Sequence, residues 1–268
     1  MSEARYELKA AKRLGIGIDV GSTTTKGVLL DSDMKILASH LTLTGASASE
    51  AAKGVVSLLA EQSGISLKGV KMVSTGYGRS SVQSADKSVT EITCHSLGIH
   101  LLNPSIATLI DVGGQDSKVI RIGENGRPAD FELNDKCSAG TGRFLEVMAR
   151  VLGTTIDELG PLALRSKKPS SISSTCTVFA ESEVVGRIGA GDAPADIAAG
   201  VHQAMASKIA TLARRVGVKT PAGLTGGVAL NPAFKYYLSK QLSVELWVPE
   251  QPQTTGAIGA ALLALTEK

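Results

Sequence analysis

A carboxylate, a glycine turn and a lysine recur together at two places in the chain. Residues 19–26 read DVGSTTTK and residues 111–118 read DVGGQDSK, with Asp, Val, Gly and Lys at the same four offsets. Each copy follows a short apolar run and leads into another, which is the pattern of a strand, a tight turn and a second strand. Two such hairpins can hold one polyphosphate from opposite sides. The repeat therefore predicts a nucleotide site and a chain of two related halves.

Each residue type in the two copies has a defined use at a phosphate. Glycine lets the backbone approach an anion, and the amides and hydroxyls that follow it can bind phosphate oxygens. Carboxylates can hold hydrated Mg²⁺ or orient the attacking water. We expect Asp19, Asp111 and Gln115 to be catalytic. The nucleotide-binding residues of the hairpins are then Gly21, Ser22, Thr23, Thr24, Thr25, Lys26, Gly113, Gly114 and Gln115.

One copy alone would be explained by turn chemistry, because Asp and Gly are common between strands. A third glycine turn strengthens the nucleotide interpretation. It lies in LTGGVALN (224–231), opens a predicted helix and fits an adenosine-binding loop with Gly226 and Gly227. The segment 252–259, with Gln253, opens the last helix and could close the same pocket. A P-loop of the form G-x-x-x-x-G-K-[ST] does not occur in the sequence, so we assign phosphate binding to the hairpins.

Two of the three cysteines stand just before predicted helices. Cys137 lies in NDKCSAGTGRF (134–144) and Cys176 in SSTCTVFAESE (173–183). Unpaired amides and the positive end of a helix dipole favour a thiolate at such a position. The same amides can donate hydrogen bonds to the sulfurs of a ligated anionic cluster. From position alone, two small, buried, inert side chains are an equal alternative.

The third cysteine has different surroundings. Cys94 lies in an apolar, helix-like run without a glycine-rich start, and we expect it in the core. His95 and His100 in the same run could ligate a metal, but ordinary core or surface histidines are the simpler interpretation.

The hydrophobic pattern predicts alternating strands and helices. Strands are expected at 35–43, 70–74, 130–133 and 244–248, with a further strand ending at 224–227. Helices are expected at 46–63, with Ser47 or Ser49 as the cap and Gly64 as the stop, and at about 140–152, 178–189, 194–216, 231–241 and 255–266. The segment 161–169 is expected to be a polar loop. Strand-strand-strand-helix thus appears in both halves.

Composition excludes several classes of protein. A formal charge of +3 over 268 residues is too small and too scattered to indicate nucleic acid binding. No run approaches the roughly 18 apolar residues of a membrane span, and the N-terminus does not resemble a secretory signal. We therefore expect a cytoplasmic protein in which the three cysteines act as thiols, ligands or catalysts rather than as disulfides.

Six segments in order resemble one family. GIDVGSTTTK, STGYGR, IDVGGQDSKVI, NDKCSAGTGRFLEVMA, SSTCTVFAESEV and LTGGVALN are similar to the ATP-dependent activator (component A) of 2-hydroxyacyl-CoA dehydratases, a family that includes the ATPase subunits of benzoyl-CoA reductase. The resemblance runs from about residue 15 to residue 263, and the two cysteine motifs are its most discriminating parts. The order of two phosphate turns and an adenosine turn also resembles the superfamily of acetate and sugar kinases, heat-shock chaperones and actin.

The resemblance implies an α/β fold of two ribonuclease H-like (actin-like ATPase) lobes with a nucleotide cleft between them. The first lobe would be 1–105, completed by the C-terminal helix 250–268. The second would be 106–249, with the second hairpin, the cysteine motifs and the adenosine loop. It further implies ATP or ADP with Mg²⁺, a homodimer sharing one [4Fe–4S] cluster, a ferredoxin or flavodoxin donor, and electron transfer to a dehydratase or reductase component.

The residues agree with a shared cluster. A cubane cluster takes four thiolates, and Cys137 and Cys176 supply two per chain, so a two-fold dimer completes the set. The alternative function is a small-molecule kinase of the same superfamily, with Asp111 as base, and a third is a non-catalytic nucleotide sensor. Neither alternative gives the paired cysteine motifs a role.

Overall fold

The computed structural model describes residues 12–173 and 176–266. Residues 1–11, residues 174–175 of the second cysteine motif and residues 267–268 of the predicted C-terminal segment lie outside this description. The contacts divide the chain into two compact units. The first takes the residues up to Val89 and those from Ala257 onward, and the second takes Thr90–Gly256.

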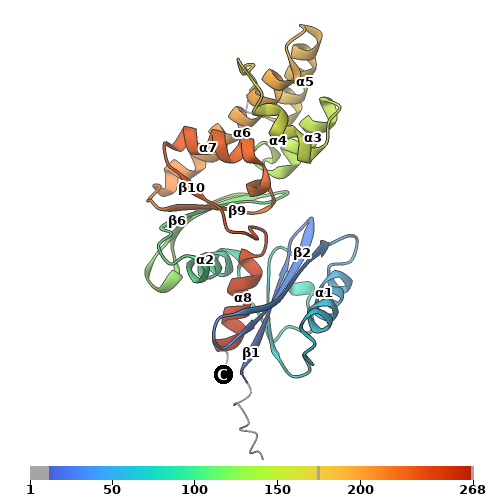
Figure 1. Ribbon diagram of the computed structural model, residues 1–268, viewed down its shortest axis with the longest axis vertical. Helices are drawn as coiled ribbons and strands as arrows, with labels where there is room; N and C mark the ends of the chain where they lie inside the picture. The colour runs from blue at the N-terminus through green and yellow to red at the C-terminus, as the bar shows by residue number, and fades with distance from the viewer. Residues whose placement is uncertain (1–11, 174–175, 267–268) are drawn as a thin grey trace, which may run out of the picture. The chain divides into compact units, whose positions relative to one another are not determined.

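Both units contain a five-stranded mixed sheet with the same strand order. The first sheet has the order β3-β2-β1-β4-β5, and the second has β10-β9-β6-β7-β8, which is the same order read in reverse (Figure 1). Their strands are β1 (Leu14–Val20), β2 (Thr24–Asp31), β3 (Ile36–Leu43), β4 (Lys71–Thr75) and β5 (Lys87–Ser88), then β6 (Thr108–Val112), β7 (Ser117–Ile122), β8 (Pro128–Asn134), β9 (Ala222–Thr225) and β10 (Leu246–Trp247). Each repeated motif forms an antiparallel hairpin, β1–β2 or β6–β7, as the repeat predicts.

The first unit places its sheet between two helices. α1 (Ala48–Ser63) begins after Ser47, whose side chain accepts from the Glu50 amide, and ends at Gly64 with φ 66°. These are the predicted cap and stop. On the other face, α8 (Thr255–Thr266) lies so close to β1 that a Cβ at Gly17 would overlap the backbone of Ala257.

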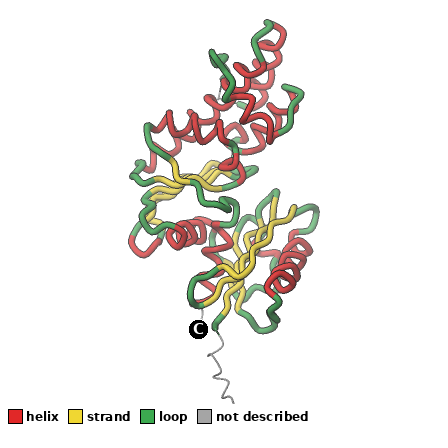
Figure 2. The backbone as a smooth tube through the Cα atoms, in the orientation of Figure 1, coloured by secondary structure: helices red, strands yellow, loops and turns green. Residues whose placement is uncertain are grey.

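The second unit carries one helix on one face of its sheet and a helical layer on the other (Figures 1 and 2). α2 (Glu91–Leu102) packs through Ile99 against Leu109 and Ile120. The other layer holds α3 (Gly142–Val151), α4 (Ile156–Ala163), α5 (Thr177–Gly189), α6 (Pro194–Val216) and α7 (Pro232–Leu242). α6 lies at its centre, and its buried face forms the core with residues such as Phe144 and Phe234.

Helix α4 extends to Ala163 and so corrects the first three residues of the predicted loop at 161–169, whereas residues 164–169 lie outside any helix or strand. Its start has a capping box, in which the Thr155 side chain accepts from the Glu158 amide and the Glu158 carboxylate accepts from the Thr155 amide. Pro161 lies inside the helix, where it removes one backbone donor. The Thr-x-x-Glu spacing was the available signal, and it outweighs the proline because the cap satisfies the amides at the helix start.

The boundary between the two units comes earlier in the chain than the expected one between residues 105 and 106, because helix α2 belongs to the second unit. Ser96 Oγ donates to the Gly126 carbonyl at 2.7 Å, so the helix is attached to the turn that connects β7 and β8. The second unit therefore begins at Thr90. None of the described helices is long and apolar enough to cross a membrane.

Candidate functional site

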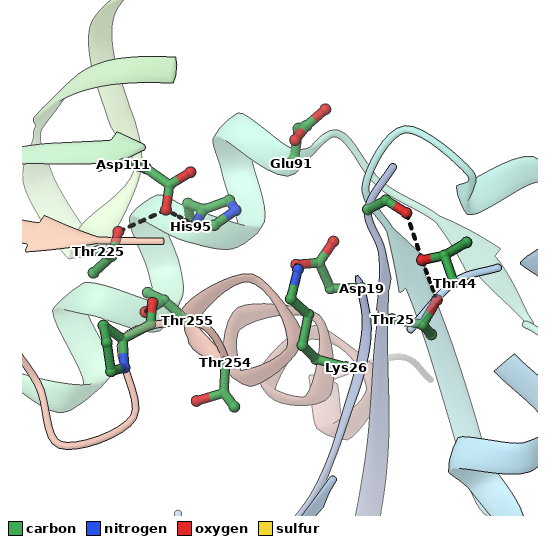
Figure 3. Close-up of polar contacts among 12 residues, drawn as sticks. Asp19, Thr25, Lys26, Thr44, Glu91, His95, Asp111, Thr225, Thr254 and Thr255 are labelled. Carbon is green, nitrogen blue, oxygen red and sulfur yellow. Dashed lines mark hydrogen bonds and ion pairs between the residues drawn. The ribbon is translucent and has the colours of Figure 1, made fainter. Parts of the chain in front are cut away.

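The first hairpin forms a closed turn with two exposed hydroxyl residues at its tip. The Gly21 amide donates to the Thr24 carbonyl at 3.0 Å, and Ser22 and Thr23 are exposed. Thr44 at the end of β3 supports the turn, because its hydroxyl donates to the Gly21 carbonyl at 2.8 Å (Figure 3). The amides and hydroxyls at the tip are therefore available to an anion.

Thr25 departs from its expected role. Its side chain is buried and its hydroxyl lies 3.0 Å from the Thr44 hydroxyl. The alternation of side chains along β2 turns Thr25 inward, so that its side chain ties β2 to β3 instead of facing a phosphate.

Asp19 lies beneath this turn and faces Lys26 across the hairpin. The two residues are register partners, and Lys26 Nζ lies 3.7 Å from Asp19 Oδ2. The STGYGR segment explains the space beside the carboxylate. Gly76 has φ 90°, and a Cβ there would lie 2.5 Å from Asp19 Oδ1. Glycine at this position leaves Asp19 room that any other residue would fill.

The second hairpin repeats this construction. The Gly113 amide donates to the Asp116 carbonyl at 2.9 Å, and Gln115 is exposed at the tip. Asp111 is buried, and Lys118 Nζ, in the register position of Lys26, lies 3.6 Å from its Oδ2. The two hairpins therefore share the closed glycine turn and the Asp–Lys pair.

Two residues that the sequence did not single out for this site converge on Asp111 (Figure 3). Thr225 Oγ1 donates to Asp111 Oδ1 at 2.8 Å, and His95 Nδ1 lies 3.5 Å from the same oxygen. The sequence predicts an ordinary core or surface histidine at position 95. His95 is buried, but it lies against Asp111, a candidate catalytic residue.

Lys118 lies among three carboxylates. Its Nζ is 2.8 Å from Asp116 Oδ2, 2.9 Å from Glu91 Oε2 and 3.6 Å from Asp111 Oδ2. Burial alone would lower the pKa of Lys118, but these carboxylates outweigh it and raise the pKa above its ordinary value. Lys118 therefore stays charged. Glu91 and His95 are four residues apart on α2, and this spacing on one helix face was the signal that could have indicated both.

The third glycine turn packs against the second sheet at the end of β9. Gly226 has φ 86°, and a Cβ there would overlap the Val112 carbonyl. Its amide donates to the Pro252 carbonyl at 2.9 Å, and Gln253 Nε2 lies 3.5 Å from the position a Gly227 Cβ would take. The predicted adenosine turn and the segment with Gln253 are thus adjacent, as the sequence suggested.

The two cysteine segments also come together. The residues that follow Cys137 and Cys176 are linked, because the Ser138 and Thr177 hydroxyls lie 2.8 Å apart. Both cysteines are partly exposed free thiols, whereas Cys94 is fully buried, as expected.

One helix start differs from the prediction. Cys176 directly precedes α5, but Cys137 precedes a single 3-10 turn (Ser138–Gly140), and α3 begins only at Gly142. Cys176 therefore lies at the start of an α-helix, as predicted, and Cys137 does not.

The two cysteines have the donor chemistry of an iron–sulfur cluster. Two neighbouring, partly exposed thiols are soft ligands that suit iron–sulfur clusters. Among the described residues there is no group of three or more metal-ligating side chains. One chain therefore offers half of a four-thiolate set, and α5 next to it exposes Val178, Phe179 and Val185.

A short chain of hydrogen bonds joins the second hairpin to the first cysteine segment. The amides of Gly142 and Arg143 donate to the carbonyls of Gly113 and Gly114 at 2.8 and 2.9 Å. Asn134 Nδ2 donates to the Cys137 carbonyl at 2.8 Å and to Ser117 Oγ at 3.4 Å. The turn that would hold phosphate is thus bonded directly to the start of α3, and the strand after it is linked to a candidate cluster ligand.

The arrangement matches a known group of ATPases. Residues 16–264 match the model of the BadF/BadG/BcrA/BcrD ATPase family. The chain belongs to this family. A 2-hydroxyisocaproyl-CoA dehydratase activator of Clostridioides difficile is 42% identical to this chain over 253 residues. The match covers 94% of this chain and 95% of the relative.

Two solved structures closely resemble the structure of this chain. Component A of (R)-2-hydroxyglutaryl-CoA dehydratase from Acidaminococcus fermentans superimposes with a TM-score of 0.91 at 42% identity, covering 95% of this chain and 98% of the other. The 2-hydroxyisocaproyl-CoA dehydratase activator with bound ADPNP gives 0.88 at 41% identity, with 94% of each chain covered. The resemblance in the sequence and the two-sheet actin-like ATPase fold are both confirmed.

Proposed function

We propose that this protein is the ATP-dependent activator of a 2-hydroxyacyl-CoA dehydratase, which hydrolyses MgATP and passes a low-potential electron to that partner. The observation that carries the proposal is the hydrogen-bonded connection from the Gly113–Gly114 turn to the segment that follows Cys137. Family membership favours the activator over the kinase alternative. The ring-reductase partner, which the resemblance also allows, is an alternative electron acceptor for the same chemistry.

The two hairpins supply the nucleotide chemistry in this proposal. The tips at Gly21–Thr24 and Gly113–Gln115 bind phosphate oxygens through amides and hydroxyls, and Lys26 adds a positive charge. Asp19 and Asp111 hold hydrated Mg²⁺ or orient the attacking water. Gln115, at the exposed tip of its hairpin, is the second candidate for orienting water. Gly226, Gly227 and Gln253 form the adenosine side.

Cys137 and Cys176, with the same two residues of a second copy, would hold one [4Fe–4S] cluster in a homodimer. Such a cluster supplies one-electron transfer. The exposed apolar side chains Val178, Phe179 and Val185 on α5 support an interface between copies at this place, because they follow directly on Cys176. A ferredoxin or flavodoxin would load the electron, and a cytoplasmic location remains a prediction from the sequence.

Hydrolysis and electron transfer are coupled in this proposal through the second unit. Phosphate contacts at Gly113 and Gly114 change the position of the amides of Gly142 and Arg143, and Asn134 carries the change at β7 to the backbone of Cys137. ATP and ADP must bind the two resulting states with different affinities, because a nucleotide with equal affinity for both would not shift the equilibrium between them.

The test uses the full chain purified without oxygen. Iron and sulfide analysis should give about four of each per dimer, and the protein with MgATP should transfer an electron to a 2-hydroxyacyl-CoA dehydratase, whereas MgADPNP should not support it. Iron-free protein that phosphorylates a small hydroxy compound would instead establish the kinase alternative.

A further inference from the structure

The two units share a residue pair that the eight-residue repeat does not contain. Thr75 is the register partner of Asp19 between parallel strands β1 and β4, and Thr225 is the register partner of Asp111 between β6 and β9. In each unit the next residue is a glycine with positive φ, 90° at Gly76 and 86° at Gly226. Because register partners on neighbouring strands point to the same face of a sheet, each threonine lies beside its aspartate.

The two threonines differ in one respect. Thr225 Oγ1 donates to Asp111 Oδ1 at 2.8 Å. Thr75 is fully buried, yet its hydroxyl has no hydrogen-bond partner among the residues that the structure describes. A buried hydroxyl without a partner disfavours the folded state, so it requires an explanation.

The surroundings of Asp19 explain why the Thr75 hydroxyl is unpaired. Lys26 forms an ion pair with Asp19, but its Nζ lies 3.7 Å from Oδ2, which is longer than a hydrogen bond. Gly76 allows the Asp19 carboxylate to lie close to the end of β4, because a Cβ there would be 2.5 Å from Oδ1. Thr75 is the register partner of Asp19 on that strand, so a rotation of the carboxylate would bring one of its oxygens to the Thr75 hydroxyl.

We propose that Thr75 is a positioning residue for Asp19, and that its hydroxyl donates to the Asp19 carboxylate when nucleotide is bound, as the Thr225 hydroxyl does for Asp111 in the structure described. One oxygen of Asp19 is then fixed by the hydroxyl, which leaves the other oriented toward a metal-bound or attacking water. The inference rests on the proposed role of Asp19 in ATP hydrolysis, and it gives the aspartates of the two hairpins different hydrogen-bond partners before nucleotide binds.

The experiment compares Thr75→Val, which removes the hydroxyl at constant shape, with Thr75→Ser, which keeps it. In Thr75→Val we expect kcat for ATP hydrolysis to fall about tenfold, the effect of one hydrogen bond to a charged group, with KM for ATP within about twofold. Thr75→Ser should restore kcat to within about twofold of the starting protein. The nucleotide-free Thr75→Val protein should melt at the same or a higher temperature, because it no longer buries an unpaired hydroxyl.

Two controls separate this role from a structural one. Thr108→Val removes a buried hydroxyl that donates to the Lys219 carbonyl at 2.8 Å, at the opposite end of β6 from Asp111, so it should lower the melting temperature without lowering kcat. Thr225→Val should lower both. A Thr75→Val protein with unchanged kcat, or one whose kcat falls only as its melting temperature falls, would overturn the inference.

The outcome is distinguishable from a failure of the proposed function. If Asp19→Asn lowers hydrolysis and Thr75→Val does not, Asp19 keeps its role and only the role of Thr75 is lost. If Asp19→Asn is fully active, the assignment of the hairpin itself is wrong.

Discussion

Asp111 and Lys118 face each other across a hairpin with 3.6 Å between Oδ2 and Nζ, and Asp19 and Lys26 repeat the relationship at 3.7 Å. The surroundings of the two lysines differ. The side chain of Lys118 is 3% exposed and contacts Asp116 and Glu91 as well, whereas that of Lys26 is 13% exposed and forms its ion pair with Asp19. The same pair is therefore part of a buried charge cluster in one unit and a simpler ion pair in the other.

Replacing each lysine by methionine tests this difference. Lys118→Met leaves Asp111, Asp116 and Glu91 without their shared cation, and we expect the free energy of unfolding to fall by about 3–5 kcal/mol, as for a buried pair that loses one partner. Lys26→Met, the matched control, should cost less, because Lys26 pairs with one carboxylate rather than with three. Urea unfolding followed by circular dichroism measures both. Equal losses would show that the cluster around Lys118 is not a stabilising unit.

Asp19→Asn and Asp111→Asn test the hydrolytic site. Each variant keeps the size of the side chain, and the amide oxygen introduced by Asp111→Asn can still accept from Thr225, but neither variant holds the negative charge that positions Mg²⁺ or water. We expect ATP turnover to fall by roughly 10²-fold or more in each, with a folded protein that still binds ADP by calorimetry. Unchanged turnover in both variants would reject the assignment.

Cysteine variants test the cluster. Cys137→Ser or Cys176→Ser removes two of four ligands from a symmetric dimer, so anaerobically purified protein should lose its iron or lose it rapidly in air. Cys94→Ser changes a fully buried thiol in α2 and should keep its iron. Iron content and the visible spectrum are the measurements, and the reverse pattern would place the cluster elsewhere.

Asn134→Ala tests the connection between hairpin and cluster. Its amide links Ser117 Oγ to the Cys137 carbonyl, and it lies outside the proposed contacts to nucleotide and iron. We expect ADP affinity and iron content within about twofold of the starting protein but several-fold more ATP hydrolysed per electron delivered. The closely related change Asn134→Asp keeps an acceptor and loses the donor, so it should behave like the alanine variant. An unchanged ratio of ATP to electrons in both would mean that coupling runs through Gly142 and Arg143 alone.

His202 in α6 predicts a pH dependence of stability. Burial lowers the pKa of His202 to about 4. The Ala198 carbonyl oxygen, 2.7 Å from Nδ1, has a smaller effect in the opposite direction. The unfolded chain therefore binds the extra proton between about pH 6.5 and 4. Stability from this group is complete above pH 6.5 and falls by up to about 1.4 kcal/mol per pH unit as the pH drops through that window.

The control is His202→Gln, which cannot titrate. Urea unfolding at several pH values between 7.5 and 5 should show a shallower slope in this variant, whatever its stability at neutral pH, because the other histidines are common to both proteins. Parallel slopes would show that His202 is charged or accessible in the folded state.

Local sequence patterns determined much of the architecture. The two D-V-G hairpins, the helix from Ser47 to Gly64 and the long helix at 194–216 are encoded within a few residues, because turn, cap and periodicity signals act over that range. The paired cysteine motifs are local too, and they identified the family. Two exceptions were α4, where a proline concealed a capping box, and the 3-10 turn that separates Cys137 from α3.

The tertiary structure decided which side chains meet. Thr225 is 114 residues from Asp111 in the sequence, and only the parallel register of β6 with β9 places its hydroxyl on that carboxylate. The link between Ser138 and Thr177 depends likewise on how α3, α5 and α6 pack, and the inward side chain of Thr25 depends on its pairing with β3. Such contacts arise from strand register and helix packing between distant segments, which short-range patterns do not specify; the residue types were set by the sequence, and their partners by the fold.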